Sequence, residues 1–496
     1  TAELVALTTD QAQAITTQQA FALGTAQVVA LATDDFAAVN TASIAALQTA
    51  QIASLATVQA QALTTAQAIA LTTKQVAAIV TADIAALTTL VVSSLTSEQI
   101  VALRTDQVFA LKTQQAVALT TDQLLAMETA DFASLSTSAI AALATYTVSV
   151  LSSADIIALS SAQAQAITTG QAYALTTAQV EALETRDAAA LSTSSIAALQ
   201  TAQIVALRSD QAQYLATQQI VALGTAQVVA LETQDFAALN TNSIAALLTA
   251  QVAALSSDEI VALRTDQAFA LTTQQAVALG TAQIASLETA DISAISTRSM
   301  AALTTSQIFA ITTAQVQSLA TQQVVALGVA QIAALETPQD AVALSTSSIA
   351  ALLISQVVAL TTTQAAALSS DQVYALTTAQ LVGMETADFA AINTSAIAAL
   401  RTAQVVALTT ADIIALRTDQ AAALITQQAF ALTTAQLVAL ETRDFASLTS
   451  DSIAALQTAQ VVALTTAEIV ALRTDQAQAI TTSQAFALTT AQVVAL

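Results

Sequence analysis

The residues best suited to chemistry in this chain are carboxylates that recur in the pattern Glu-Thr-x-Asp. Carboxylate oxygens are hard ligands, and several of them brought together from adjacent turns of a fold would hold Ca²⁺ and relieve their own repulsion. One hypothesis is therefore a calcium ladder, which is the one metal site that the sequence offers. It consists of Glu128, Asp131, Glu184, Asp187, Glu232, Asp235, Glu288, Asp291, Glu336, Asp340, Glu385, Asp388, Glu441 and Asp444.

The alternative interpretation of these carboxylates needs no cofactor. Each Asp then lies at the N-terminus of a helix, where it caps the helix and interacts favourably with the helix dipole, and each Glu is solvated. A melting temperature that does not change on chelation would remove the calcium hypothesis.

Catalysis has few other residues to use. The chain contains no His and no Cys, so its many Ser and Thr hydroxyls lack their usual base and there is no thiolate nucleophile. An array of near-identical units also offers no unique concave pocket in which carboxylate pKa values would shift. We expect that the protein is not an enzyme.

The elements that must position these carboxylates are short repeats. The chain divides into about 62 units of eight residues, here called octads, of the form T-x-Q-Φ-x-A-L-x, where Φ is Val, Ile, Ala or Phe. One unit, which begins at Thr337, has an extra residue. Eight residues cannot bury their own apolar face, so copies must stack. We predict a single continuous solenoid over residues 1–496, a slice of a longer array.

Two kinds of solenoid fit an octad. Apolar fourth and sixth positions together with Val, Ile and Thr favour a β-solenoid, but its corners would need many more turn residues than six Gly and one Pro. The opening Thr of the octad suits a helix N-cap, and Pro338 suits a first helical position. We predict an all-α solenoid of Thr-capped helices, one per octad, with a β-solenoid as the alternative.

A longer period predicts how the octads stack. Asp replaces Gln at the third position at intervals of 48 to 56 residues, with a mean of about 51 residues or about 6.4 octads, which we interpret as one superhelical turn. The fourth-position Φ and the seventh-position Leu would point to the axis of a packed rod. Phe21, Phe269, Phe430 and Phe486 each follow an Ala, and we interpret them as large-for-small exchanges where volume is constrained.

Charge and hydropathy limit the kinds of partner that the chain can have. A net charge of −23 with only 11 Lys and Arg opposes a phosphate-binding track, so we expect no nucleic acid. No run approaches the roughly 18 apolar residues of a spanning helix, so we expect no membrane insertion. Five arginines form a column on another side of the rod from the glutamates of the Glu-Thr-x-Asp pattern. Because this Arg column could contact those glutamates in a parallel rod, we expect self-association into fibres or lateral bundles. Its residues are Arg104, Arg208, Arg264, Arg417 and Arg473.

The composition also carries a resemblance. The acidic array, rich in Ala, Thr, Gln and Leu and free of Cys, resembles the repetitive regions of very large secreted bacterial surface proteins and adhesin stalks. The resemblance implies an extracellular or cell-surface location. The function that we expect is a structural rod, fibre, stalk or coat on a bacterial cell; the alternative is a solenoid scaffold that binds peptides, glycans or ions.

Overall fold

Short α-helices make up the fold. The computed structural model describes residues 6–335 and 338–496, and within these ranges it contains helices α2 to α62 and no strand. Each helix has four to six residues, from α2 (Thr9–Gln13) to α62 (Thr490–Ala495), and except for α43 each begins at the first residue of an octad. The prediction of one helix per octad is confirmed, and the β-solenoid is excluded. None of the described helices has the length and apolarity needed to cross a bilayer.

The helix start at the slipped octad is the predicted one, because α43 (Pro338–Ala343) begins at its Pro. The predicted cap, however, is wrong by one residue. In α13 (Ser97–Val101) the N-cap is Thr96, the last residue of the previous octad, and the opening Ser or Thr of an octad is the first helical residue. A Gln side chain reaches back to the N-cap N–H from the third helical position. A helix that begins at the first residue of the octad has the octad's Gln as its third residue, which is the position from which the side chain can reach the N-cap N–H.

Extended residues form the corners between helices. After α3 (Thr17–Ala22), Leu23 has φ −62° and ψ 140°, and Gly24 has φ −75° and ψ 156°. Any residue adopts these angles, and no described residue has a positive φ. The array therefore turns a corner in every octad with almost no Gly.

The fourth and seventh positions form the core, as predicted. Ile100 and Leu103 are typical, with exposed fractions of 0% and 5%. The largest core side chains are fourth-position phenylalanines: Phe36, Phe132, Phe236, Phe389 and Phe445. Near the start of the chain, the core around Ala20, Val28 and Phe36 encloses a cavity of only about 10 Å³, which is at the lower limit for one water molecule. The interior is packed and is not a pore.

The fifth-position phenylalanines are surface residues, so their interpretation as exchanges within the core is wrong. Their exposed fractions range from 54% to 88%, and they are Phe21, Phe269, Phe430 and Phe486. The fifth position lies two residues after the buried third position, which is about 200° round the helix. Their rings therefore point away from the axis.

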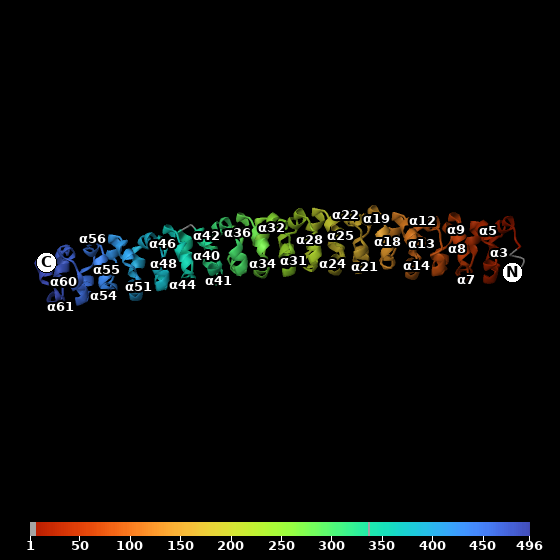
Figure 1. The fold of residues 1–496 in the computed structure, drawn as a ribbon. Helices are drawn as coiled ribbons and strands as arrows, with labels where there is room; N and C mark the ends of the chain where they lie inside the picture. Colours follow the sequence, from red (N-terminus) through yellow and green to blue (C-terminus); the bar gives the residue numbers. More distant parts are fainter. Residues whose placement is uncertain (1–5, 336–337) are drawn as a thin grey trace. The chain divides into compact units, whose positions relative to one another are not determined.

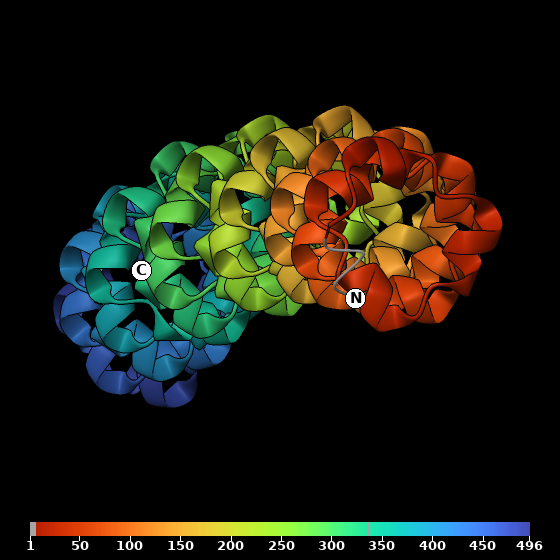
Figure 2. The same cartoon turned by 90° about the vertical axis from the view of Figure 1, so that its right-hand side faces the viewer.

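The helices form two compact units, Thr1–Leu247 and Leu248–Leu496. Within each unit the helices coil round an axis, and Figure 2 shows this ring for the N-terminal helices (Figures 1 and 2). Helices that contact each other are three apart in the chain, as in α22 (Thr169–Ala174) and α25 (Thr193–Ala198). One turn of each solenoid therefore takes just over three helices.

The predicted turn of about 6.4 octads is twice too large. The Thr105 hydroxyl donates to Asp131 Oδ1 at 2.7 Å, and these two residues are 26 positions apart in adjacent turns. The 51-residue period of the Asp residues thus spans two turns. Aliphatic side chains of the size of Val, Ile and Leu fill the narrow axis of a three-sided coil, whereas a six-sided coil would be about 20 Å across.

The sixth position of an octad lies against the first position of the preceding turn. Gly383 ends α48 (Thr378–Gly383), and a Cβ atom added to it would lie 2.7 Å from Ile354 Cγ2 in α45 (Ile354–Val358). Most octads have a small Ala and a Thr at these two positions. Here an oversized first-position Ile faces a Gly, so the two exceptions compensate for each other.

This pair supports a double-mutant prediction. Gly383→Ala is expected to lower the free energy of unfolding by about 1–3 kcal/mol, because the new methyl group overpacks against a β-branched side chain. In an Ile354→Thr background the same change is expected to be neutral or stabilising. Urea unfolding of the four proteins measures the coupling, and additive effects would contradict the compensation.

Candidate functional site

Third-position glutamines bind each turn to the preceding one. In α15 (Thr113–Ala118), the backbone N–H of Lys112 donates to Gln115 Oε1 at 2.7 Å. Gln115 Nε2 donates to the carbonyl oxygens of Ile84 and Leu87 at 2.7 and 2.8 Å. We call this arrangement a glutamine clip: one buried amide that caps its own helix and fixes two carbonyls of the preceding turn.

Glutamine clips recur along both units. Examples with the same three bonds are Gln99, Gln211, Gln307 and Gln436. Because Gln satisfies the N–H of the N-cap residue, the side chain at that position is free to vary, which explains the open eighth position. The sequence signal for the clip was the capping-box pattern Ser/Thr-x-x-Gln, as in Thr96 to Gln99.

Aspartates replace the clip at the predicted ladder positions. Asp187 in α24 (Thr185–Ala190) is fully buried, and its Oδ1 accepts a hydrogen bond from the Ser161 hydroxyl of the preceding turn at 2.8 Å. The other predicted aspartates are likewise buried and accept a hydroxyl at 2.5 to 2.9 Å: Asp131, Asp235, Asp291, Asp340, Asp388 and Asp444. An Asp therefore accepts a bond between turns where a Gln donates two.

The predicted glutamates occupy a different environment. They are N-cap residues at the surface, and their side chains make no cap hydrogen bond: Glu128, Glu184, Glu232, Glu288, Glu385 and Glu441. Glu336 lies outside the described residues. Arg186 Nη2 lies 2.9 Å from Glu184 Oε2 and contributes little stability at this exposure.

The structure does not bring the predicted ladder together as a ligand set. Within one Glu-Thr-x-Asp copy the Glu lies at the surface and the Asp in the interior, and successive copies are two turns apart. Among the described residues, no group of three or more carboxylates is close enough to share a metal ion. The adjacent turn supplies a hydroxyl to each Asp instead of a second carboxylate.

Chelation is therefore expected to leave the protein unchanged. A bound ion would stabilise the folded state by mass action and raise its melting temperature. Because the carboxylates do not form a ligand set, the melting temperature in excess EDTA should equal that in millimolar Ca²⁺ to within about 1 °C. Circular dichroism melts in the two buffers make the measurement. A melting temperature that rises with Ca²⁺ concentration would contradict this expectation.

Some buried aspartates leave one oxygen without a partner. The Oδ2 atoms of Asp83, Asp187, Asp291 and Asp444 are buried and have no hydrogen-bond partner. Burial raises the pKa of Asp83, Asp187 and Asp291 above the usual carboxyl value, and the hydroxyl bonds from the preceding turn offset part of this rise. These carboxylates are poorly solvated acceptors next to the core.

Two aspartates at equivalent positions accept bonds from their own N-cap residue on Oδ2. Asp155 accepts the backbone N–H of Ser152 at 3.1 Å and its hydroxyl at 2.6 Å on Oδ2, and the Thr129 hydroxyl at 3.2 Å on Oδ1. Asp412 makes the same capping box with Thr409. Both follow a Ser or Thr N-cap, whereas the aspartates of the Glu-Thr-x-Asp pattern follow a Glu.

The octad identifies the family. The ALTTAQ repeat matches the chain in eight segments that cover more than half of it: residues 28–65, 76–113, 124–160, 180–217, 228–265, 284–321, 381–418 and 437–474. The chain belongs to the ALTTAQ repeat family. No curated protein matches the chain. In an ALTTAQ repeat the hexapeptide itself spans the corner: in Ala487 to Gln492, Thr489 is the N-cap and Gln492 makes the clip.

The arginines of the Arg column bind partners within this ALTTAQ array. Arg104 pairs with Asp106 through two hydrogen bonds of 2.9 and 3.0 Å and also donates to the Ala77 carbonyl of the preceding turn. The pairing with the Asp two residues ahead recurs at Arg208, Arg264, Arg417 and Arg473. The Arg208 guanidinium, and then the Thr185 hydroxyl, lower the pKa of Asp210 to about 2.

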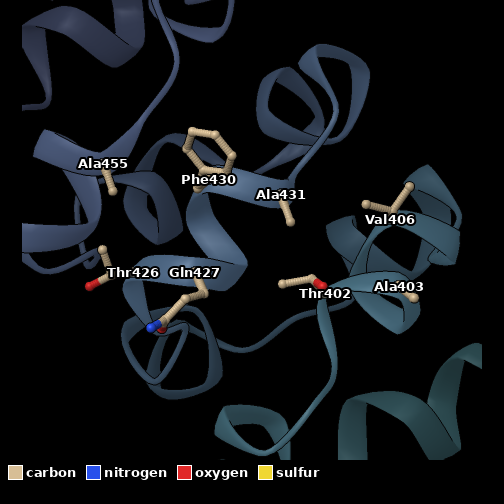
Figure 3. Close-up of a pocket in the computed structure, with 8 residues that line it drawn as sticks. All are labelled: Thr402, Ala403, Val406, Thr426, Gln427, Phe430, Ala431 and Ala455. Carbon is tan, nitrogen blue, oxygen red and sulfur yellow. The ribbon is translucent and has the colours of Figure 1, made fainter.

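The surface of the ALTTAQ array also carries apolar grooves. In the second unit, a groove of about 820 Å³ crosses α51 (Thr402–Ala407), α54 (Thr426–Ala431) and α57 (Ser450–Ala455). Figure 3 shows Phe430 and Val406 on two sides of it. An equivalent groove of about 620 Å³ lies beside Phe309. Fifth-position side chains and small alanines thus form a groove that repeats with the array.

Proposed function

We propose that the chain is a structural repeat protein without catalytic activity, which forms an extracellular rod, fibre, stalk or coat on a bacterial cell. The observation that supports this proposal most strongly is the recurrence of the glutamine clips. Within each unit, successive turns are bonded by the same buried amides, so an added copy repeats the same contacts. Length is then proportional to copy number.

Conditions outside a cell suit this chemistry. The chain has no Cys to oxidise, and its stability comes from buried apolar side chains and neutral amides, which salt and redox state affect little. Its strong negative charge opposes contact with nucleic acids, and we propose none as partners.

Self-association is part of the proposal. Fifth-position apolar side chains such as Phe109 and Phe309 are more than 60% exposed, and such side chains recur along the surface of each unit. Contiguous exposed apolar surface favours contact with another protein surface. The arginines of the Arg column are already paired with Asp residues of their own chain, so a contact with the carboxylates of a neighbouring chain would only replace one ion pair by another. We therefore propose that apolar contacts provide the lateral attraction.

Negative-stain electron microscopy of the purified chain tests the proposal. We expect elongated particles that associate side by side as concentration rises, with matching growth of the sedimentation coefficient. Separate compact particles at every concentration would contradict a fibre-forming role. Labelling of intact cells with an antibody would test the location separately.

The alternative function is a binding scaffold for peptides, glycans or ions, and the groove beside Phe430 is the observation that favours it. A scaffold predicts saturable binding that Phe430→Ala weakens. The matched control is Phe309→Ala, which alters the equivalent groove and leaves the first intact. A fibre predicts no such saturable binding.

A further inference from the structure

Asp83 occupies a glutamine-clip position without making a clip. It lies in α11 (Thr81–Ile84), is 1% exposed, and follows Val80 as N-cap, so no Ser or Thr hydroxyl of its own helix bonds to it. The Thr57 hydroxyl of the preceding turn donates to its carboxylate, and its Oδ2 is buried without a hydrogen-bond partner. A buried carboxylate oxygen with no donor is costly.

The clip of the next turn shows what this position ordinarily does. Gln107 Nε2 donates to the carbonyl oxygens of Val76 and Ile79 at 2.9 and 2.6 Å, which are 31 and 28 residues earlier. The same offsets from Asp83 lead to the carbonyls of Ile52 and Leu55. Asp83 therefore places a carboxylate acceptor where a glutamine clip places a donor against two carbonyl acceptors.

We propose that Asp83 is a proton-binding site of the folded array, which takes a proton from solvent onto Oδ2 and donates it to the Leu55 carbonyl in place of the missing clip. The O–H group supplies the donor that the Gln amide supplies elsewhere, and it removes a buried negative charge. The reaction is an acid–base equilibrium in which no other bond forms or breaks.

Few charged groups face this site. Helix α11 packs against α8 (Thr57–Ala62), which has no charged residue, and against α14 (Thr105–Phe109), whose Asp106 is exposed and paired with Arg104. Burial raises the pKa of Asp83, the Thr57 bond lowers it in part, and no neighbouring charge contributes. The proton affinity of Asp83 is therefore a property of its place between two turns.

The sign of the pH effect follows from this raised pKa. The folded state binds the proton more tightly than the unfolded state, so the stabilisation is complete below the ordinary carboxyl pKa. It is lost as pH rises through the raised pKa of the folded state. The turns around Asp83 should therefore be held together more firmly in mild acid than at neutral pH.

Hydrogen–deuterium exchange of the full chain tests the proposal, because it measures opening locally. In the wild type, protection of peptides within residues 49–87, corrected for intrinsic rates, should fall as pH rises from about 4 to 8. In Asp83→Asn, whose amide is a permanent donor, protection should be nearly independent of pH and about tenfold greater than wild type at neutral pH.

Asp155→Asn provides the matched control, because both oxygens of Asp155 already have donors. Peptides around this residue should show no gain in protection at neutral pH. Equal pH profiles for the wild type and Asp83→Asn would overturn the proposal, and so would an equal gain in the control. If Asp83→Asn fails to fold, the wild-type profiles decide: a decline confined to the turns around Asp83 supports the proposal, and parallel declines around Asp83 and Asp155 refute it.

Discussion

Gln115→Leu is expected to lower the free energy for opening its turn by about 3 kcal/mol. The variant keeps a similar volume but leaves the Lys112 N–H and the carbonyls of Ile84 and Leu87 without their amide partner. A buried hydrogen bond contributes about 0.5–1.5 kcal/mol, and an unsatisfied buried group costs more. Urea unfolding and exchange protection of the two adjoining turns measure the loss.

The chain supplies a control at the adjacent position. Gln114 is exposed and makes no clip, so Gln114→Leu is expected to change stability by less than about 0.5 kcal/mol. Equal effects of the two substitutions would show that the buried amide is not what joins the turns.

Phe389→Ala is expected to cost still more, about 3–5 kcal/mol, because it leaves a large cavity in a core that has almost no free volume. Phe389 is fully buried at the fourth position of α49 (Thr386–Ala391). In a solenoid the loss is local, so the neighbouring turns should lose exchange protection while distant turns keep theirs.

Phe430→Ala is the matched control for this substitution, because Phe430 lies at the fifth position and is 54% exposed. Its loss should be below about 1 kcal/mol. A large loss from Phe430 and a small one from Phe389 would contradict the assignment of the octad's faces.

Much of the fold follows from the octad alone. A unit too short to bury its own face has to stack, and apolar fourth and seventh positions such as Ile100 and Leu103 have to face the stack. The helix start at Pro338 follows from its missing N–H and its fixed φ. These features depend only on interactions within about eight residues, which a sequence pattern states directly.

The turn size does not follow from the pattern, because a sequence period gives a whole number of turns without saying which number. The Asp residues recur on every second turn, so their period of about 51 residues is equally compatible with one large turn and with two small ones. The surface position of Phe430 also needed the structure, since its direction depends on where the helix begins relative to the octad.

The candidate site was predicted in part. The aspartates of the Glu-Thr-x-Asp pattern are buried at helix N-termini, where the second interpretation placed them, but the glutamates are not beside them. The octad pattern does not predict the clips, because it indicates only that the third-position Gln lies in the first helical turn. The bond from Gln115 to Leu87 joins residues 28 apart, and no local pattern contains such a partner.

The central claim is that one turn takes about 26 residues, and disulfide trapping in this cysteine-free chain tests it most directly. The hydroxyls of Thr113 and Ser138, 25 residues apart in adjacent turns, lie 3.0 Å from each other at the surface. Thr113→Cys with Ser138→Cys should therefore form an intramolecular disulfide readily under mild oxidation. Thr113→Cys with Ser161→Cys, six octads apart, should stay reduced, and rapid bonding of this second pair with none in the first would contradict the account.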